Sequence, residues 1–290
     1  MELGHRATRS GKLSGFLREE MGISAGLVNR LKWDGRLRVN GEPARTNHPV
    51  VPGDEITVVL DEPAPEYPPE EMPLEILYED DHVLAVDKPA GMLIHPSRSR
   101  DTGTLANGVI GYYRRTGQAA AFHPVTRLDR DTYGVVLLGK HSHSHAVLQE
   151  LSRQGKVEKV YHALVWGGPA ENAGVIDAPI ARCPLPSLLR YVSPEGKPCR
   201  TEFRVLQRWE DCTLLQLRPV TGRTHQLRVH CAHCGYPILG DPQYGSEDSQ
   251  RLSETLGLET QRLCAKQLRF THPITGEWIT IESRQKAAIE

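Results

Sequence analysis

The chain has 290 residues, of which 39% are hydrophobic and 24% are charged, and its formal net charge is −1 at pH 7. This length suits one large domain or two smaller ones, and the composition is that of a soluble globular protein. No apolar run approaches the roughly 20 residues that span a membrane, and the first residues lack the apolar core of a signal peptide, so we expect a cytoplasmic protein with reduced cysteines and no membrane partner.

The charges divide the chain into three parts. Residues 1–60 carry a net charge of +2, residues 61–81 carry −9, and residues 82–290 carry +6. Residues 61–73 contain five prolines and no lysine or arginine, a composition typical of an extended linker. We therefore predict an N-terminal domain over 1–60, a linker over 61–73 and a second domain over 74–290. Two mildly basic bodies suit a polyanionic partner.

The N-terminal part reads as two helices and a hairpin. One helix starts near Leu13, a second can be N-capped by Ser24, and Asn40-Gly41 is the favoured two-residue hairpin turn. A strand is predicted over residues 55–60. Basic residues gather on the second helix and the hairpin, and they are Arg30, Lys32, Arg36, Arg38 and Arg45. Such a run is often only a solvated face.

The run GRLRVNGEPARTNHPVVPGDEITV, however, resembles the small S-four-like RNA-binding module, named after a ribosomal small-subunit protein. That module presents helix and hairpin bases to RNA phosphates. The resemblance implies that Arg30, Lys32, Arg36 and Arg38 bind RNA, adding affinity and orientation rather than chemistry.

After the linker, residues 82–86 read as a strand, residues 89–92 as a turn and residues 104–116 as a helix. His95 follows the turn and could serve as a ligand or a base. No partner is evident for it in the sequence, so we predict a hydrogen-bonded structural role.

The stretch HPVTRLDRDTYGVVLLGK, residues 123–140, concentrates the charge of the chain's centre. Two carboxylates and two guanidiniums lie between Arg127 and Asp131, directly before an apolar run, residues 135–138, that predicts a buried strand. Charges placed against a core are costly unless they are paired, and such places are often functional. The alternative is an ion-paired turn, and either Asp129 or Asp131 could act as a nucleophile.

A helix is predicted over residues 142–154 and an alternating strand over 156–166. The helix begins with three histidines two residues apart, a spacing that does not favour a metal site because no single helical face brings them together. Tyr161 lies within the strand. On residue type alone it would be a core ring with a hydrogen-bonded hydroxyl.

Residues 198–219 read as two strands joined at Asp211, followed by a helix that Thr224 can cap and that runs to Gly235. A helix N-terminus beside Arg223 is a ready anion site. Cys231 and Cys234 form a lone C-x-x-C inside this helix, which is weak evidence for zinc or redox chemistry.

Several of these stretches together resemble the RluA-type pseudouridine synthases. They are the run ILYEDDHVLAVDKPAGMLIHP, the loop TRLDRDTYG, the strand KVYHALVWG, the run GRTHQLRVH with its later GYPILGD, and the closing RLCAKQLRFTHP. The loop departs from the family pattern at Thr126, often His, and at Tyr133, often Ser. Neither change touches Arg127, Asp129 or Gly134.

This resemblance implies an α+β fold with a mostly antiparallel central sheet flanked by helices. It implies that Asp129 is the nucleophile, that Arg228 pairs with it and favours its ionised form, and that Tyr161 stacks on the target base with its hydroxyl near the proton to be removed. Arg127 would fill the space that a flipped-out uridine leaves. Arg223 and His225 would bind RNA or brace the loop. No cofactor is needed.

We therefore predict an RNA pseudouridine synthase that acts as a monomer, with 23S ribosomal RNA as the first choice of substrate and transfer RNA as the second. A non-catalytic RNA-binding or ribosome-assembly protein is the first rival. The other is a hydrolase using Asp129 and Asp131 as an acid–base pair, but the adjacent arginines would keep both ionised.

Overall fold

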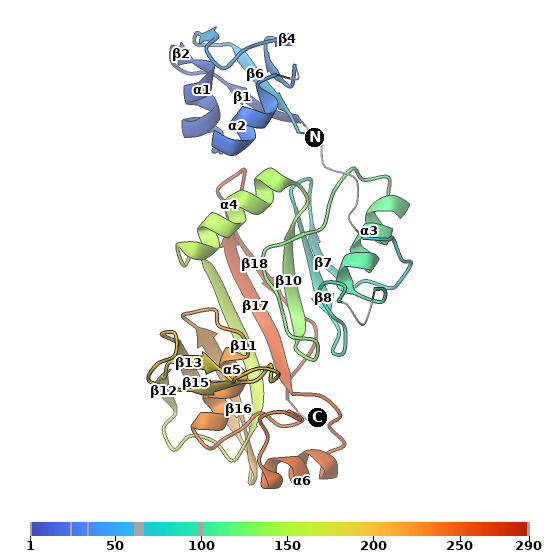
Figure 1. Cartoon of the computed structure of the whole chain (residues 1–290), viewed down its shortest axis with the longest axis vertical. Coiled ribbons are helices and arrows are strands. Elements are labelled where there is room, and N and C mark those ends of the chain that lie inside the picture. Colours follow the sequence, from blue (N-terminus) through green and yellow to red (C-terminus); the bar gives the residue numbers. More distant parts are fainter. Residues whose placement is uncertain (1, 24, 34, 61–66, 98–100, 289–290) are drawn as a thin grey trace.

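The structure is a computed structural model of the chain that describes residues 2–23, 25–33, 35–60, 67–97 and 101–288 (Figure 1). The predicted N-cap Ser24 and residues 61–66 of the predicted linker lie outside the described residues. Within these ranges, no helix combines the length and the hydrophobicity that crossing a membrane would require.

The N-terminal part folds around its own core. Its strands are β1 (Glu2–Arg6), β2 (Gly11–Lys12), β3 (Leu37–Val39), β4 (Glu42–Pro43), β5 (Pro49–Val50) and β6 (Glu55–Val59), and its helices are α1 (Leu13–Gly15), the π-helical η1 (Phe16–Glu20) and α2 (Ala25–Leu31). The main sheet has the order β1-β6-β3-β4, and the buried apolar cluster draws on residues between Leu3 and Leu60. The Asn40-Gly41 hairpin turn is confirmed, since both residues have positive φ and join β3 to β4.

A ten-stranded sheet forms the rest of the framework. Its strands are β7 (Ile76–Glu79), β8 (Val83–Lys88), β9 (His123–Pro124), β10 (Tyr133–Gly139), β11 (Val157–Trp166), β12 (Ala173–Asp177), β15 (Arg200–Arg208), β16 (Cys212–Pro219), β17 (Leu263–Thr271) and β18 (Trp278–Glu282). The order is β12-β15-β16-β11-β17-β10-β8-β7, with β18 on β17 and β9 on β10. Every pairing in this described sheet is antiparallel except β10 with β17. The predicted α+β class with a mostly antiparallel central sheet is confirmed.

Helices cover both faces of this sheet (Figure 1). They are α3 (Leu105–Arg115), α4 (Ser142–Arg153), α5 (Gln226–His233) and α6 (Glu247–Thr255), and β13 (Ile180–Arg182) with β14 (Arg190–Val192) forms a separate hairpin. Along β10, Val136 and Leu138 pack with the α3 cluster, whereas Val135 and Leu137 pack with Leu148 of α4. Because both faces are covered, the whole of β10 is buried, as its apolar run predicts.

Gly134 explains how β10 approaches β17 so closely. Its φ is +109°, and a Cβ atom built on it would lie 2.4 Å from the backbone oxygen of Ala265. Only glycine meets both conditions without displacing the neighbouring strand. This contact fixes where the charged loop before β10 enters the sheet.

The predicted starts of two helices, near residue 104 and at Thr224, differ in outcome. The helix near residue 104 is confirmed, because Thr104 and Asn107 form a capping box at the start of α3. The predicted cap at Thr224 is wrong. The residue preceding α5 is His225, in the left-handed conformation (φ +58°, ψ +18°), with no side-chain cap. Hydrogen bonds made by the Gln226 side chain set this start instead, and they are described below.

Candidate active site

Polar contacts with neighbouring segments hold the loop between Arg127 and Thr132 in place. The fully buried Lys88 donates from Nζ to the backbone oxygens of Pro89, Met92 and Arg130 at 2.8–2.9 Å. Gln261 donates to the Thr132 hydroxyl at 2.5 Å, and the Thr126 hydroxyl accepts from the backbone of Leu137. These bonds tie both ends of the loop to the sheet.

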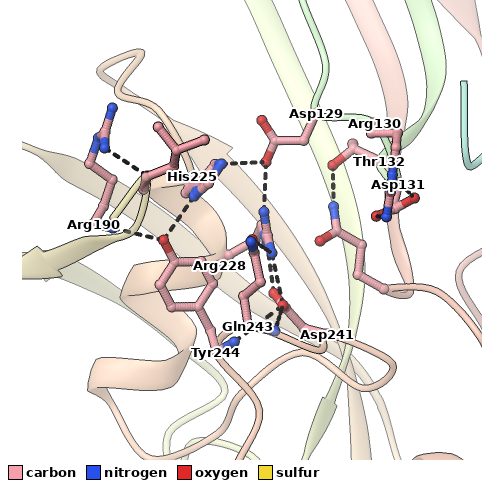
Figure 2. Close-up of polar contacts among 12 residues, drawn as sticks. Asp129, Arg130, Asp131, Thr132, Arg190, His225, Arg228, Asp241, Gln243 and Tyr244 are labelled. Carbon is pink, nitrogen blue, oxygen red and sulfur yellow. Dashed lines mark hydrogen bonds and ion pairs between the residues drawn. The ribbon is translucent and has the colours of Figure 1, made fainter. Parts of the chain in front are cut away.

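Asp129 projects from this loop towards α5, as Figure 2 shows. Its Oδ2 atom accepts a hydrogen bond from Arg228 Nη1 at 3.2 Å, and His225 Nε2 lies 3.9 Å from the same oxygen. The Asp129 side chain is 30% exposed, whereas that of Arg228 is 6% exposed. The site therefore presents a half-open carboxylate against a buried guanidinium.

Asp241 holds that guanidinium in place. The Asp241 carboxylate, with a side-chain exposure of 0%, accepts from Arg228 Nε at 2.7 Å and from Nη2 at 2.8 Å, and Nη2 also donates to Gln243. Burial alone would lower the pKa of Arg228, but the hydrogen bonds and charge of Asp241, with the charge of Asp129, raise it. Asp241 and Gln243 are site residues that were not predicted from the sequence, although Asp241 ends the GYPILGD run.

His225 and Tyr244 complete the cluster. His225 Nδ1 lies 2.8 Å from the Tyr244 hydroxyl, which also accepts the backbone N–H of Arg190 at 2.9 Å. The Tyr244 ring lies 4.9 Å from the centre of the Arg228 guanidinium, within cation–π range. The side chain of Gln226 fixes the preceding corner by bonding to Thr221, to the backbone of Arg223 and to β15.

The rival carboxylate Asp131 lies in a different setting. Both of its oxygens accept hydrogen bonds from the neighbouring Arg130, at 3.0 and 2.9 Å. Its side chain is 17% exposed, against 30% for Asp129. Asp131 is thus the more enclosed carboxylate, and its neighbour already occupies both oxygens.

Tyr161 lies on β11 close to Asp129. Burial raises the pKa of Tyr161, and the negative charge of Asp129 raises it further, so the phenol keeps its proton at neutral pH. The β11–β17 register shifts between Val160 and Tyr161. Such irregularities often re-aim a side chain beside an active site.

Among the described residues, the remaining predicted ones make no hydrogen bond or ion pair with Asp129. Arg127 is exposed on the loop, and Arg223 donates from Nε to the backbone oxygen of Pro198 at 3.2 Å. His95 lies 3.3 Å from the Tyr67 hydroxyl. Cys231 is buried in α5, whereas Cys234 is exposed. The bases Arg30, Lys32, Arg36 and Arg38 belong to the N-terminal part, which lies apart from α5 in Figure 1.

This arrangement suits covalent chemistry by a carboxylate. Arg228 donates a hydrogen bond to the Asp129 carboxylate, and the exposed fraction of Asp129 leaves room for a substrate. In the part of the chain that the structure describes, no group of three or more His, Cys, Asp or Glu side chains is placed to hold a metal ion.

Comparison with known proteins identifies relatives over most of the chain. The family described as RNA pseudouridylate synthase matches residues 82–233. An uncharacterized RNA pseudouridine synthase of Bacillus subtilis, YjbO, is 39% identical over 89% of this chain and 90% of its own length. Ribosomal large subunit pseudouridine synthase C of Vibrio parahaemolyticus is 33% identical over 96% and 90%. Human RNA pseudouridylate synthase domain containing 1 shares the fold, with a TM-score of 0.62 and 24% identity over 75% of this chain and 86% of that one.

Proposed function

This chain belongs to the RNA pseudouridylate synthase family, whose members are isomerases, and on that premise we propose that it converts specific uridines of 23S ribosomal RNA to pseudouridine through Asp129. The observation that carries the assignment of Asp129 is its half-open carboxylate, 3.2 Å from the buried guanidinium of Arg228. The choice of 23S RNA is supported by relatives named for the large ribosomal subunit.

In the proposed reaction, the bond from the uracil N1 to the ribose C1′ breaks and a bond from C5 to C1′ forms. The C5 proton leaves and N1 takes up a proton, so the product is an isomer of the substrate, and any bond to Asp129 is broken again before the product leaves. Electrons balance without an oxidant or a reductant. Asp129 provides the nucleophile for a covalent intermediate. Tyr161 lies close enough to Asp129 for that charge to raise the pKa of the phenol. In the proposed reaction, its ring stacks on the target base with its hydroxyl near the departing proton.

The target uridine must leave its stack before Asp129 can reach it. Arg127 is exposed two residues before Asp129, so its side chain is free to enter the space that the base vacates. Occupying that space offsets part of the unstacking cost of a few kcal/mol.

The N-terminal domain over 1–60 is the second part of the proposal. Its S-four-like resemblance, its separate core and its basic helix and hairpin support a role in holding the RNA. Next to Lys32, Trp33 is 74% exposed, with the lysine ammonium 5.2 Å from the ring centre. An exposed ring flanked by bases suits stacking on an unpaired nucleotide. We place this domain on a linker over 61–73 in a protein that acts as a monomer in the cytoplasm.

The function is tested with 23S RNA transcripts that carry tritium at uracil C5. The wild-type protein should release tritium, and Asp129→Asn should release none while keeping its fold by circular dichroism. Asp131→Asn is the matched control and should keep most of the activity. Full activity of Asp129→Asn would overturn the nucleophile assignment, whereas silence of the wild type on every RNA would overturn the function.

The substrate is tested by mapping pseudouridines in cells that lack the protein. We expect sites in 23S RNA to disappear; loss of transfer RNA sites instead would redirect the assignment. For the N-terminal domain, the double variant Arg30→Gln, Arg38→Gln should raise KM with kcat unchanged. Arg153→Gln, Arg251→Gln is its control, because these arginines are 74% and 71% exposed on α4 and α6.

A further inference from the structure

Two hydrogen bonds and one longer charged contact connect the β13–β14 hairpin to Asp129 (Figure 2). The backbone N–H of Arg190 donates to the Tyr244 hydroxyl, the Tyr244 hydroxyl lies 2.8 Å from His225 Nδ1, and His225 Nε2 lies 3.9 Å from Asp129 Oδ2. The reaction proposed above does not use Tyr244 or His225.

The geometry settles which nitrogen of His225 carries the proton. The Tyr244 oxygen already accepts the Arg190 N–H, and among the described residues His225 Nδ1 is the other hydrogen-bond partner of that hydroxyl. If Tyr244 donates its proton to Nδ1, the phenol proton, the phenol oxygen and Nδ1 all have partners. The opposite choice leaves the phenol proton without an acceptor. Burial lowers the pKa of His225 and raises that of Tyr244, so a neutral imidazole accepts from a protonated phenol. The remaining proton then lies on Nε2, which faces Asp129.

Both donors around Asp129 approach the same oxygen. Arg228 Nη1 lies 3.2 Å and His225 Nε2 lies 3.9 Å from Oδ2. Within the described part of the chain, Oδ1 has no partner. One oxygen is thus held while the other remains open to a substrate.

We propose that Tyr244 locks His225 as its Nε2–H tautomer, and that this N–H acts with Arg228 to hold Asp129 Oδ2 so that Oδ1 is the attacking oxygen. His225 is then a positioning residue. Of the two roles that the resemblance implies, binding RNA or bracing the loop, this inference selects the second. The inference rests on the proposed function of Asp129.

The backbone conformation at His225 indicates that the fold itself fixes the position of the imidazole. A left-handed conformation is uncommon for residues other than glycine, although histidine and asparagine are enriched in it, and strain of this kind persists where the surroundings impose it. Here Gln226 imposes it, since its amide bonds to the Thr221 hydroxyl, to the Arg223 N–H and to the Arg200 backbone oxygen on β15. The corner therefore holds the imidazole against Asp129 before any RNA arrives.

The first test measures the tautomer by nitrogen NMR on histidine-labelled protein. The His225 signals are those that vanish in His225→Asn, a substitution that tolerates the left-handed backbone. In the wild type at pH 7.5, we expect an unprotonated Nδ1 and a protonated Nε2. In Tyr244→Phe, the Nδ1–H form should appear, and in the control Tyr191→Phe, at an exposed tyrosine, the signals should stay as in the wild type. An Nδ1–H form or an imidazolium in the wild type would overturn the inference.

The second test is kinetic. His225→Asn keeps a polar group beside Tyr244 but lacks the N–H donor that faces Asp129, so kcat should fall about 10- to 100-fold. KM should change less than about twofold, and the control His233→Asn, at an exposed histidine on the same helix, should match the wild type. A raised KM with unchanged kcat would mean that His225 binds RNA. The NMR result does not depend on turnover, so a wild type without synthase activity would remove the function and leave the tautomer standing.

Discussion

The ladder between β8 and β10 ends in a buried lysine on each side, and the two lysines are satisfied in different ways. At the Asp129 end, Lys88 donates to three backbone oxygens and to no carboxylate among the described residues. At the other end, Lys140 donates to the Glu79 carboxylate at 3.0 Å and to the Asp80 backbone oxygen at 2.6 Å. Both residues are buried lysines, but within the described chain only Lys140 donates a hydrogen bond to a carboxylate.

The difference shows what an active carboxylate requires. Around Glu79, burial raises the pKa of the acid, but hydrogen bonds from Tyr112, Gln118 and Lys140 outweigh burial and lower it, so this acid is fully engaged. At the Asp129 end, main-chain oxygens accept the hydrogen bonds of Lys88, and the Asp129 carboxylate keeps one oxygen open. When an ammonium donates its hydrogen bonds to backbone oxygens, the neighbouring acid remains available for chemistry.

The largest effect at the Asp129 end should come from Asp241→Asn. Removing one partner of a buried ion pair costs about 3–5 kcal/mol of unfolding free energy, and a displaced Arg228 should lower kcat about 100-fold. Urea unfolding and tritium release measure the two losses. Asp177→Asn removes an exposed partner of Arg200 and should cost under about 0.5 kcal/mol. Equal losses in both variants would show that Asp241 is not the support of Arg228.

A second test moves the loop rather than its partners. Gly134→Ala adds a Cβ atom 2.4 Å from a backbone oxygen at positive φ, so we expect about 3 kcal/mol of destabilisation with reduced turnover. Gly155→Ala is the control for φ alone, since Gly155 has φ +72° and open space around it, and it should cost about 1 kcal/mol. If the two variants unfold at the same urea concentration, the contact with β17 does not place the loop.

The sequence predicted those parts of the fold and the site that continuous apolar runs and family motifs reveal. The apolar run before Gly139 predicted a buried strand, and the resemblance led to a mostly antiparallel sheet; both are confirmed. It also suggested that Asp129 and Arg228, 99 positions apart, lie together, and the structure places them 3.2 Å apart. Runs and motifs of this kind are visible without knowledge of tertiary contacts.

What the sequence missed depends on contacts between distant segments. Thr224 is a good cap by residue type, yet the start of α5 is set by Gln226, which bonds to Thr201 and to the Arg200 backbone on another strand. Asp241 belongs to the GYPILGD run of the resemblance, but its role becomes visible only where its carboxylate contacts Arg228. Similarly, η1 shows no break in apolar spacing, because Phe16 and Leu17 are buried as a regular helix would bury them.

A change at Lys140, at the end of the β8–β10 ladder away from Asp129, should lower stability without lowering turnover. Lys140→Met leaves Glu79 and the Asp80 backbone oxygen without their cation, so we expect a loss of about 2 kcal/mol in urea unfolding. Turnover of the folded protein should stay within about twofold, because the Lys140 contacts do not reach Asp129. Arg153→Met, in an exposed pair with Glu150, is the control for losing a positive charge. A tenfold fall in kcat for Lys140→Met would connect the two ends and weaken the comparison.

The smallest expected effect concerns the pH dependence that Lys88 contributes. Burial lowers the pKa of Lys88 to about 7, against the charges of Asp131 and Asp129, whereas an unfolded lysine titrates near about 10.4. Between these values the unfolded chain holds the extra proton, so raising the pH favours the folded chain. The penalty is therefore complete below pH 7 and disappears above about 10.4.

Relative to Lys88→Met, the wild type should gain about 1 kcal/mol per pH unit between pH 8 and 9, measured by urea unfolding of both proteins in parallel. The comparison cancels every other titrating group. A difference that stays flat over this range would mean that Lys88 remains an ammonium in the folded chain. In that case the three backbone oxygens, and the carboxylates beyond them, compensate fully for its burial.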